Sequence, residues 1–215
     1  MSSHNPTPLI RPGKRAVIAA RTGSGKTVLA AHLASAAPVH WVVINPKWTA
    51  GYKDLKSSRT IEGINYSEIE DSIESHKFTI VNPLKHECKA DIMDDLISYL
   101  HEEYSNIGII CDELLSLHRN GIAGDGLTGW LTRGRELGQS FIGLTQRPKR
   151  ISMFVFSEAD YIGAMDLTLK GDRERMREVT GDDRFLNFRT RAHRWLWYDV
   201  GRDNLRLFGA VPIAK

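Results

Sequence analysis

The chain has 215 residues, of which 41% are hydrophobic and 26% charged, the composition of one globular domain, and its formal net charge of +3 neither requires nor excludes a polyanionic partner. No apolar run is long enough for a membrane span or a signal peptide, so we expect neither a secreted protein nor a transmembrane segment. The two cysteines are too few for a disulfide framework and indicate a reducing compartment.

The first elements alternate between strand and helix. Residues 1–14 contain three prolines and little apolar content, so we expect a flexible N-terminal arm or a strap across a single domain that spans 15–215. The apolar run 15–20 predicts a buried parallel strand, and a helix follows from Gly25 until Pro38 stops it. A second strand is expected at 40–46. The polar excursion 47–76 then predicts a loop, with one short helix at 67–75.

The same alternation continues to the C-terminal quarter. Strands are predicted at 78–83, 107–114, 141–146 and around Ile162, helices at 89–104, 127–138 and 169–181, and a Gly-rich loop at 119–126. Two alternating runs about a Gly-containing turn then predict a β-hairpin at about 194–209, in which Trp195, Trp197 and Tyr198 are expected to form a packed or subunit-facing surface rather than to stack on bases. The whole pattern indicates an α/β fold with a mainly parallel central sheet, flanking helices and a C-terminal hairpin.

A phosphate-binding loop stands between the first strand and the first helix. The sequence ARTGSGKT matches the P-loop pattern except that Ala20 replaces the first glycine. Gly23 and Gly25 let successive N–H groups converge on a phosphate, Lys26 neutralises β- and γ-phosphate oxygens, and Thr27 is expected to bind Mg²⁺. The predicted nucleotide-binding residues are Ala20, Arg21, Thr22, Gly23, Ser24, Gly25, Lys26 and Thr27.

Polar residues at the ends of two later strands complete the predicted site. Asp112 and Glu113 follow four hydrophobic residues, which is unusual unless the two acids face a cation. We expect Asp112 to hold Mg²⁺ through water and Glu113 to orient or deprotonate the attacking water. Gln146 ends the strand 141–146 and is expected to sense the γ-phosphate, the alternative being a strand that merely ends in polar residues.

These motifs resemble the FtsK/HerA superfamily of P-loop ATPases, in the RecA-like additional-strand class. The resemblance covers about residues 15–171 and rests on ARTGSGKT, the NPK at 45–47, IICDEL and above all GRELGQSFIGLTQRP at 134–148. It implies ATP and Mg²⁺ as ligands and a homo-oligomeric ring, pentamer or hexamer. Arg135 would be the arginine finger that reaches the γ-phosphate of a neighbouring subunit, with Arg133 as the other choice. The chain departs from the family at Asn45, where Asp is usual, and at Ala20.

The length, without a winged-helix or nuclease domain, is similar to that of genome-packaging ATPases from tailless icosahedral viruses with an internal membrane. This resemblance implies ATP hydrolysis coupled to translocation of double-stranded DNA into a preformed capsid. Capsid or vertex proteins, and a viral membrane protein, are further implied partners. The protein would act in the cytoplasm of the infected cell or at a vertex of the virion. Other FtsK/HerA-type DNA pumps, filamentous-phage assembly ATPases, a small-molecule kinase and a nucleotide-gated binding protein are the alternatives.

Two segments are candidates for contact with DNA phosphates. One is the excursion with Lys53, Lys56 and Arg59, and the other is the Gly-rich segment with Arg119. An ordinary surface loop is the alternative for each. Such contacts would read no bases, because translocation must be indifferent to sequence.

Overall fold

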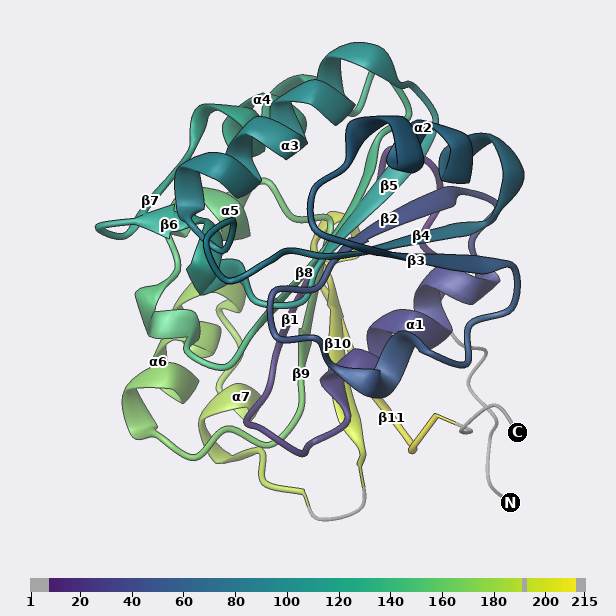
Figure 1. Cartoon of the computed structure of the whole chain (residues 1–215). Coiled ribbons are helices and arrows are strands. Elements are labelled where there is room, and N and C mark those ends of the chain that lie inside the picture. The colour runs from purple at the N-terminus through teal and green to yellow at the C-terminus, as the bar shows by residue number, and fades with distance from the viewer. Residues whose placement is uncertain (1–7, 191–192, 212–215) are drawn as a thin grey trace.

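The computed structural model describes residues 8–190 and 193–211. Its centre is a sheet of nine strands in the order β11-β10-β9-β1-β8-β5-β2-β4-β3, seen nearly edge-on in Figure 1. Neighbouring strands from β9 to β3 are parallel, and β10 is antiparallel to both β9 and β11. The strands are β1 (Arg15–Ala19), β2 (His40–Ile44), β3 (Ser58–Glu62), β4 (Phe78–Asn82), β5 (Ile107–Cys111), β8 (Ser140–Thr145), β9 (Tyr161–Ala164), β10 (Trp195–Asp199) and β11 (Asn204–Phe208).

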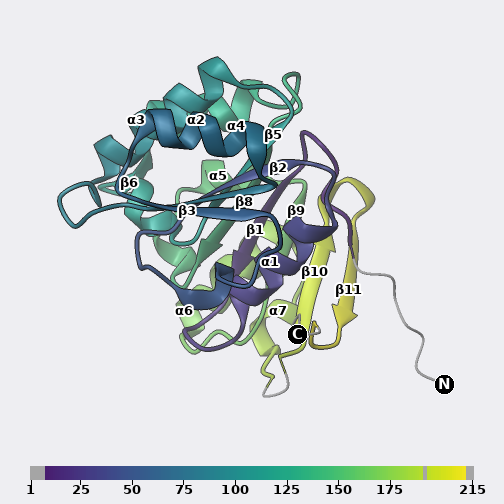
Figure 2. The same ribbon diagram turned by 45° about the vertical axis from the view of Figure 1, so that its right-hand side comes forward.

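Helices cover both faces of this sheet, with α1 on one side and α3 and α4 on the other (Figures 1 and 2). The reason lies in the strands. In β1 all five residues are buried, and they alternate between two cores: Val17 and Ala19 pack on the α3 side, Ala16 and Ile18 on the α1 side. The helices are α1 (Lys26–Ala36), α2 (Tyr66–Ser75), α3 (Ala90–Glu103), α4 (Asp125–Arg133), α5 (Met153–Ser157), α6 (Lys170–Thr180) and α7 (Arg184–Asn187). The predicted α/β class, with a mainly parallel sheet and a C-terminal hairpin, is confirmed.

Strand β8 lies between β1 and β5, and this placement defines the site. It pairs in parallel with both neighbours, and its residues Gly143 and Thr145 lie opposite Cys111 and Ala19. The P-loop, the acidic pair and Gln146 therefore leave the sheet at the same edge, as the additional-strand arrangement requires. The opposite edge carries Arg15 at the start of β1 and Tyr161 at the start of β9.

The prediction of a loop with one short helix at 47–76 is wrong in one respect, because this segment also contains β3, the last strand of the sheet. Only Ile61 of this strand is buried, so the apolar alternation that identifies a strand is missing from the sequence. Backbone pairing with β4, from Ser58 opposite Phe78 to Glu62 opposite Asn82, forms the strand instead. Arg59 consequently lies on a strand and not in a loop.

The Gly-rich loop and the helix after it also differ from the prediction. A two-stranded ribbon, β6 (His118–Arg119) and β7 (Ile122–Ala123), forms within the expected loop. Helix α4 begins at Asp125 and ends at Arg133, well before the predicted residue 138. Gly138 adopts a φ of +67°, and the N–H of Gln139 bonds to the carbonyl of Gly134, so the chain turns toward β8. Arg135 therefore lies in this turn and not on a helix.

The end of the expected arm packs against the domain. Ile10 is fully buried, and the N–H of Gly13 bonds both to the carbonyl of Gly138 and to Ser140 Oγ, each at 3.1 Å. Residues 1–7 lie outside the described residues. In the hairpin, Trp195 and Trp197 are 1% and 3% exposed, so their predicted packing is confirmed. Within the described part of the chain, no helix combines the length and the apolar character needed to span a membrane.

Candidate nucleotide-binding site

The P-loop curls tightly between β1 and α1. Gly23 and Gly25 have φ angles of +75° and +94°, in the region that glycine adopts without strain. A side chain at Gly25 would also meet His193 Nδ1 at 3.3 Å. Helix α1 begins directly afterwards at Lys26, so its first free N–H groups face the space that the loop encloses. This backbone geometry is that of an anion-binding loop.

Lys26 is half-buried at the start of α1. Burial lowers the pKa of its ammonium group; Asp112 and Glu113 act in the opposite direction, and Lys47 adds to the lowering. The residues that affect Lys26 are thus those of the acidic pair and the lysine that faces it. The lysine of the P-loop and the acids of β5 belong to one site.

Asp112 is the polar centre of the site. Its side chain is 1% exposed and accepts hydrogen bonds from Thr27 Oγ1 at 3.0 Å, Thr49 Oγ1 at 2.7 Å and Tyr52 Oη at 3.2 Å. Burial and the neighbouring Asp112 raise the pKa of Tyr52, so this phenol remains a donor. The three hydroxyl groups compensate the carboxylate for its loss of water.

Thr27 and Asp112 fit the requirements of a bound Mg²⁺. The ion prefers hard oxygen ligands at about 2.1 Å, so Thr27 Oγ1 could bind it directly while donating its proton to Asp112, whose carboxylate would hold a water of the ion. Thr27 Oγ1 and Asp112 Oδ1 are 3.0 Å apart at the end of the P-loop. Their chemistry and spacing suit a cation that also takes phosphate oxygens and water as ligands.

Glu113 makes an ion pair with Lys47, and its Oε1 also accepts the N–H of Leu115 at 3.4 Å. The carboxylate is largely buried, whereas Lys47 is 43% exposed and stands at the mouth of the site. Lys47 was not predicted as a site residue, although it belongs to the NPK motif. The motif directly follows β2, and β2 is the neighbour of β5, so Lys47 leaves the sheet beside Glu113.

Asn45, Thr49 and Tyr52 were also missed as site residues. The amide nitrogen of Asn45 donates to Asn82 Oδ1 at 2.8 Å, and its amide oxygen accepts the N–H of Thr49 at 2.9 Å. Asn45 thereby directs Thr49 toward Asp112. A side chain at this position must both donate and accept, which an amide does and a carboxylate does not.

Gln146 contacts the P-loop directly. Thr22 Oγ1 donates to Gln146 Oε1 at 2.6 Å across 124 residues of sequence. The next residue, Arg147, turns away and pairs with the buried Asp172 at 3.1 Å. Of the two polar side chains that follow β8, only Gln146 therefore faces the P-loop.

Arg21 ties the other side of the P-loop to the segment after β9. Asp166 accepts hydrogen bonds from Arg21 Nε at 2.6 Å and Arg189 Nε at 2.7 Å. Burial alone would raise the pKa of Asp166, yet the two arginines hold it below its usual value. This pair of bonds restrains the loop from the side opposite Gln146.

The remaining predicted residues lie elsewhere. Arg135 is at the opposite edge of the sheet, where Nη2 pairs with Asp160 at 3.2 Å. Arg59 pairs with Glu68 of α2 at 3.2 Å, and Arg119 is exposed on the β6-β7 ribbon. Lys53 and Lys56 are exposed between the turn at Ala50–Tyr52 and β3.

Comparisons with known proteins agree with this geometry. The DNA packaging ATPase P9 of Enterobacteria phage PRD1 is 26% identical to this chain over 212 residues, which cover 94% of this chain and 88% of that protein. No protein-family model matches the chain. Among solved structures, the genome packaging NTPase B204 from Sulfolobus turreted icosahedral virus 2, in complex with ATP-gammaS, has a TM-score of 0.73 at 17% identity and covers 94% of this chain and 99% of its own.

VirB4 of Thermoanaerobacter pseudethanolicus has a similar backbone, with a TM-score of 0.69 at 11% identity over 92% of this chain and 89% of that one. The resemblance inferred from the motifs is thereby confirmed: the chain is homologous to a DNA packaging ATPase and shares the RecA-like P-loop fold of these structures.

Proposed function

We propose that the chain is an ATP-hydrolysing translocase that packages double-stranded viral DNA into a preformed capsid, as a homo-oligomeric ring of five or six subunits. The observation that carries the proposal is the hydrogen bond between Thr27 of the P-loop and Asp112 at the end of β5, which brings the two halves of a nucleotide site into contact. The similarity to P9, a DNA packaging ATPase, along most of both chains supports the choice of substrate. The protein would act in the host cytoplasm or at a capsid vertex, with capsid or viral membrane proteins as partners.

In the proposed reaction each residue of the site has one task. The N–H groups of the P-loop and Lys26 hold the triphosphate, and Thr27 and Asp112 would hold Mg²⁺, which when bound neutralises charge on the phosphate oxygens. Glu113 accepts a proton from the attacking water once Lys47 moves off it, and Gln146 contacts the γ-phosphate from β8. Positioning and fixed charge supply most of the acceleration.

Arg135 would serve a neighbouring subunit and not its own. It precedes β8, whereas Gln146 follows that strand, so the six residues of β8 separate it from its own nucleotide by roughly 20 Å. Its side chain is 55% exposed at the sheet edge. Arg133, the other choice, folds back along α4, with Nη2 3.1 Å from where a Cβ on Gly129 would lie. The geometry favours Arg135.

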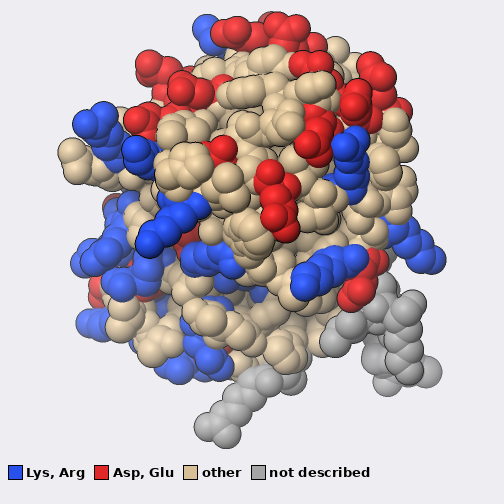
Figure 3. All heavy atoms as spheres, viewed as in Figure 1, with Lys and Arg blue, Asp and Glu red and all other residues tan. Residues whose placement is uncertain are grey.

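The distribution of charge favours one DNA-contacting surface. Acidic residues gather over α2 and α3 at the top of Figure 3, and basic residues gather at its lower left, where α6 lies. A groove of about 570 Å³ opens between the β6-β7 ribbon and α6, lined in part by Gly121, Lys149, Arg150 and Arg175. Ion pairs engage Arg147, Arg175 and Arg177 but leave Lys149, Arg150 and Arg119 unpaired within the described segments.

This basic groove also connects to the nucleotide site. The turn η2 (Leu114–Leu117) joins Glu113 to the ribbon, and η3 (Pro148–Arg150) follows Gln146 after one residue. The two walls touch where His118 Nε2 accepts the N–H of Ser152 at 3.4 Å. We place the DNA phosphates on Arg119, Lys149 and Arg150, and retain Lys53, Lys56 and Arg59 as the second candidate surface.

The first experiment tests hydrolysis and its coupling to DNA. Wild-type protein should hydrolyse ATP severalfold faster when duplex DNA is added. Glu113→Gln should lower kcat by about 10² to 10⁴ while ATP binding is retained, because the amide cannot take the proton from water. Turnover that is unchanged in the variant would exclude hydrolysis by this site. Absence of DNA stimulation at any salt concentration would exclude translocation.

The second experiment separates the two candidate DNA surfaces. The double variant Lys149→Gln/Arg150→Gln should weaken binding of duplex DNA regardless of its sequence. It should also reduce the slope of log K against log salt by about 2, since each lost phosphate contact removes about 0.9. The matched variant is Lys53→Gln/Lys56→Gln. If that variant changes the slope and the first does not, the DNA path runs over the excursion.

A further inference from the structure

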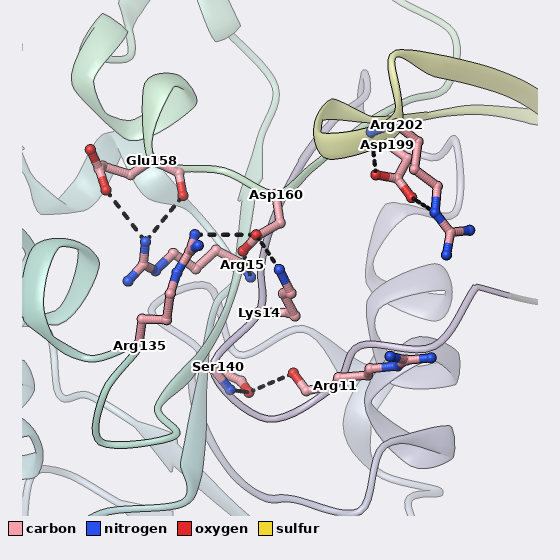
Figure 4. A network of polar contacts seen from close by, with 10 residues as sticks. Arg11, Lys14, Arg15, Arg135, Ser140, Glu158, Asp160, Asp199 and Arg202 are labelled. Atoms are coloured by element: carbon pink, nitrogen blue, oxygen red, sulfur yellow. Dashed lines mark hydrogen bonds and ion pairs between the residues drawn. The ribbon is translucent and has the colours of Figure 1, made fainter.

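A cluster of charged residues surrounds Asp160 at the sheet edge opposite the nucleotide site (Figure 4). One oxygen, Oδ1, accepts from both Lys14 Nζ at 2.7 Å and Arg135 Nη2 at 3.2 Å. The other, Oδ2, accepts the backbone N–H of Arg15 at 3.0 Å. Asp160 is itself held by its own N–H, which bonds to the carbonyl of Arg15, and by its carbonyl, which accepts the N–H of Val200. The carboxylate is therefore fixed in place, and two partly exposed cations share it.

Arg15 lies beneath this pair and is only 2% exposed. Its Nη1 bonds to Glu158, to Oε2 at 3.3 Å and to the carbonyl at 3.4 Å, whereas Nε and Nη2 are buried without a partner among the described residues. Burial first, and then the charge of Arg135, lower the pKa of Arg15. The buried guanidinium thus repels Arg135, whose one ion-pair partner among the described residues is Asp160.

The charges of the cluster do not balance while Arg135 is present. Three cations, Lys14, Arg15 and Arg135, face the two carboxylates of Glu158 and Asp160. If Arg135 departs, Lys14 remains on Asp160 and Arg15 remains on Glu158, so neither carboxylate is left unpaired. Arg135 is also the most exposed of the three, at 55% against 37% for Lys14 and 2% for Arg15. It is the cation that the cluster can release.

We infer that Asp160 and Lys14 are positioning residues for Arg135: Asp160 holds the guanidinium at the sheet edge until the triphosphate of a neighbouring subunit competes for it, and Lys14 then keeps Asp160 neutralised. This inference rests on the proposed function, in which Arg135 acts on a neighbour. The exchange is favourable because an exposed ion pair is weak, whereas a triphosphate offers several charged oxygens to a guanidinium.

Two substitutions should act in opposite directions. Asp160→Asn keeps an oxygen for the N–H of Arg15 but weakens the hold on Arg135, so the DNA-independent kcat should rise about threefold with KM for ATP unchanged. Lys14→Gln removes the cation that shares Asp160 with Arg135, so Asp160 should hold Arg135 more strongly and kcat should fall about threefold. Asp183→Asn, which breaks the exposed Arg177–Asp183 pair at 2.8 Å, is the matched control. Thermal melts show whether each variant is folded.

Mixed rings decide whether Asp160 acts through Arg135. Subunits with Lys26→Ala supply only an arginine finger, and subunits with Arg135→Ala supply only a nucleotide site, so mixing them should recover part of the activity. Asp160→Asn should raise this recovered rate when it is in the Lys26→Ala subunit and have no effect in the Arg135→Ala subunit.

Three results would overturn the inference. Equal effects of Asp160→Asn in both subunits would show a structural role for Asp160. If mixed rings recover activity but neither Asp160→Asn nor Lys14→Gln changes the rate, Asp160 does not hold Arg135, and the proposed arginine finger still stands. Rings that recover no activity at all would overturn the proposed finger and, with it, this inference.

Discussion

The two ends of strand β1 carry opposite kinds of site. At its carboxyl end, a glycine-rich loop and hydroxyl groups surround Asp112, and the open space favours an anion with a hard cation. At its amino end, Arg15 and Lys14 join Arg135 around two carboxylates, and the surplus is positive. In the proposed function, one end would receive phosphate and the other would offer a cation to the phosphate of a second copy of the chain.

The largest expected effect is a loss of ATPase activity, and the two ends of β1 differ in whether nucleotide binding is lost with it. Lys26→Ala should lower kcat/KM for ATP by about 10³ or more and also weaken nucleotide binding, because the lysine contacts phosphate in the ground state. Arg135→Ala should lower kcat by about 10³ with ATP binding unchanged, because an arginine finger acts in the transition state. Steady-state kinetics with equilibrium binding of a non-hydrolysable analogue measures both.

The control for these two variants is Lys77→Ala, a half-buried lysine far from both ends of β1 whose Nζ donates to the carbonyl of Ser35 and lies 5.8 Å from the centre of the Phe78 ring. It should leave both kinetic constants as they are. If Arg135→Ala weakens nucleotide binding as much as Lys26→Ala does, the proposed division of labour between the two ends is wrong.

A smaller effect compares glycines at the two ends. Gly13 has a φ of +73°, and a Cβ there would lie 3.0 Å from the carbonyl oxygen of Arg135, so Gly13→Ala should cost about 2 kcal/mol of unfolding free energy and lower kcat. Gly23 also has a positive φ, +75°, but a Cβ there meets no atom within 4 Å. Gly23→Ala should therefore cost only about 1 kcal/mol and raise KM for ATP.

Urea unfolding followed by fluorescence, together with ATPase kinetics, measures this pair. Gly201, which has a negative φ and no tight neighbour, is the matched position: Gly201→Ala should change neither quantity. A larger loss of stability for Gly23→Ala than for Gly13→Ala would contradict the packing described for Gly13 against residues 135–140.

The smallest effect concerns acid stability at the carboxyl end of β1. Because Arg21 and Arg189 hold the pKa of Asp166 below its unfolded value, this carboxylate stabilises the native state at pH values above the unfolded pKa of about 3.9. That contribution is lost as the pH falls through the folded pKa. Asp166→Asn should thus lower stability by about 1 kcal/mol at pH 7 and by progressively less below pH 4. A difference that is constant between pH 3 and pH 7 would show that charge is not its cause.

The residues of the carboxyl-end site could be proposed from the sequence because they form short local motifs, and the structure brings them together. Eight consecutive residues make the P-loop, and Asp112 and Glu113 are adjacent at the end of an apolar run. The amino-end cluster has no such motif, since Lys14 and Asp160 are 146 residues apart and meet only when β9 pairs with β1. Thr49 and Tyr52 were missed for the same reason. Lys47 lies within the NPK motif, but its place beside Glu113 depends on the pairing of β2 with β5. Strand β3 was missed because backbone pairing rather than apolar alternation forms it.

Strand β8 links the two kinds of site within one subunit. Gln146 follows it against the P-loop, and Arg135 lies in the turn that precedes it; the strand between them consists of six buried residues. A strand hydrogen-bonded on both sides is stiff along its length, so a shift of Gln146 on loss of the γ-phosphate would be passed as a push or pull to the turn that holds Arg135. In the proposed ring, β8 would thus couple the nucleotide site of one subunit to the arginine that this subunit offers to its neighbour.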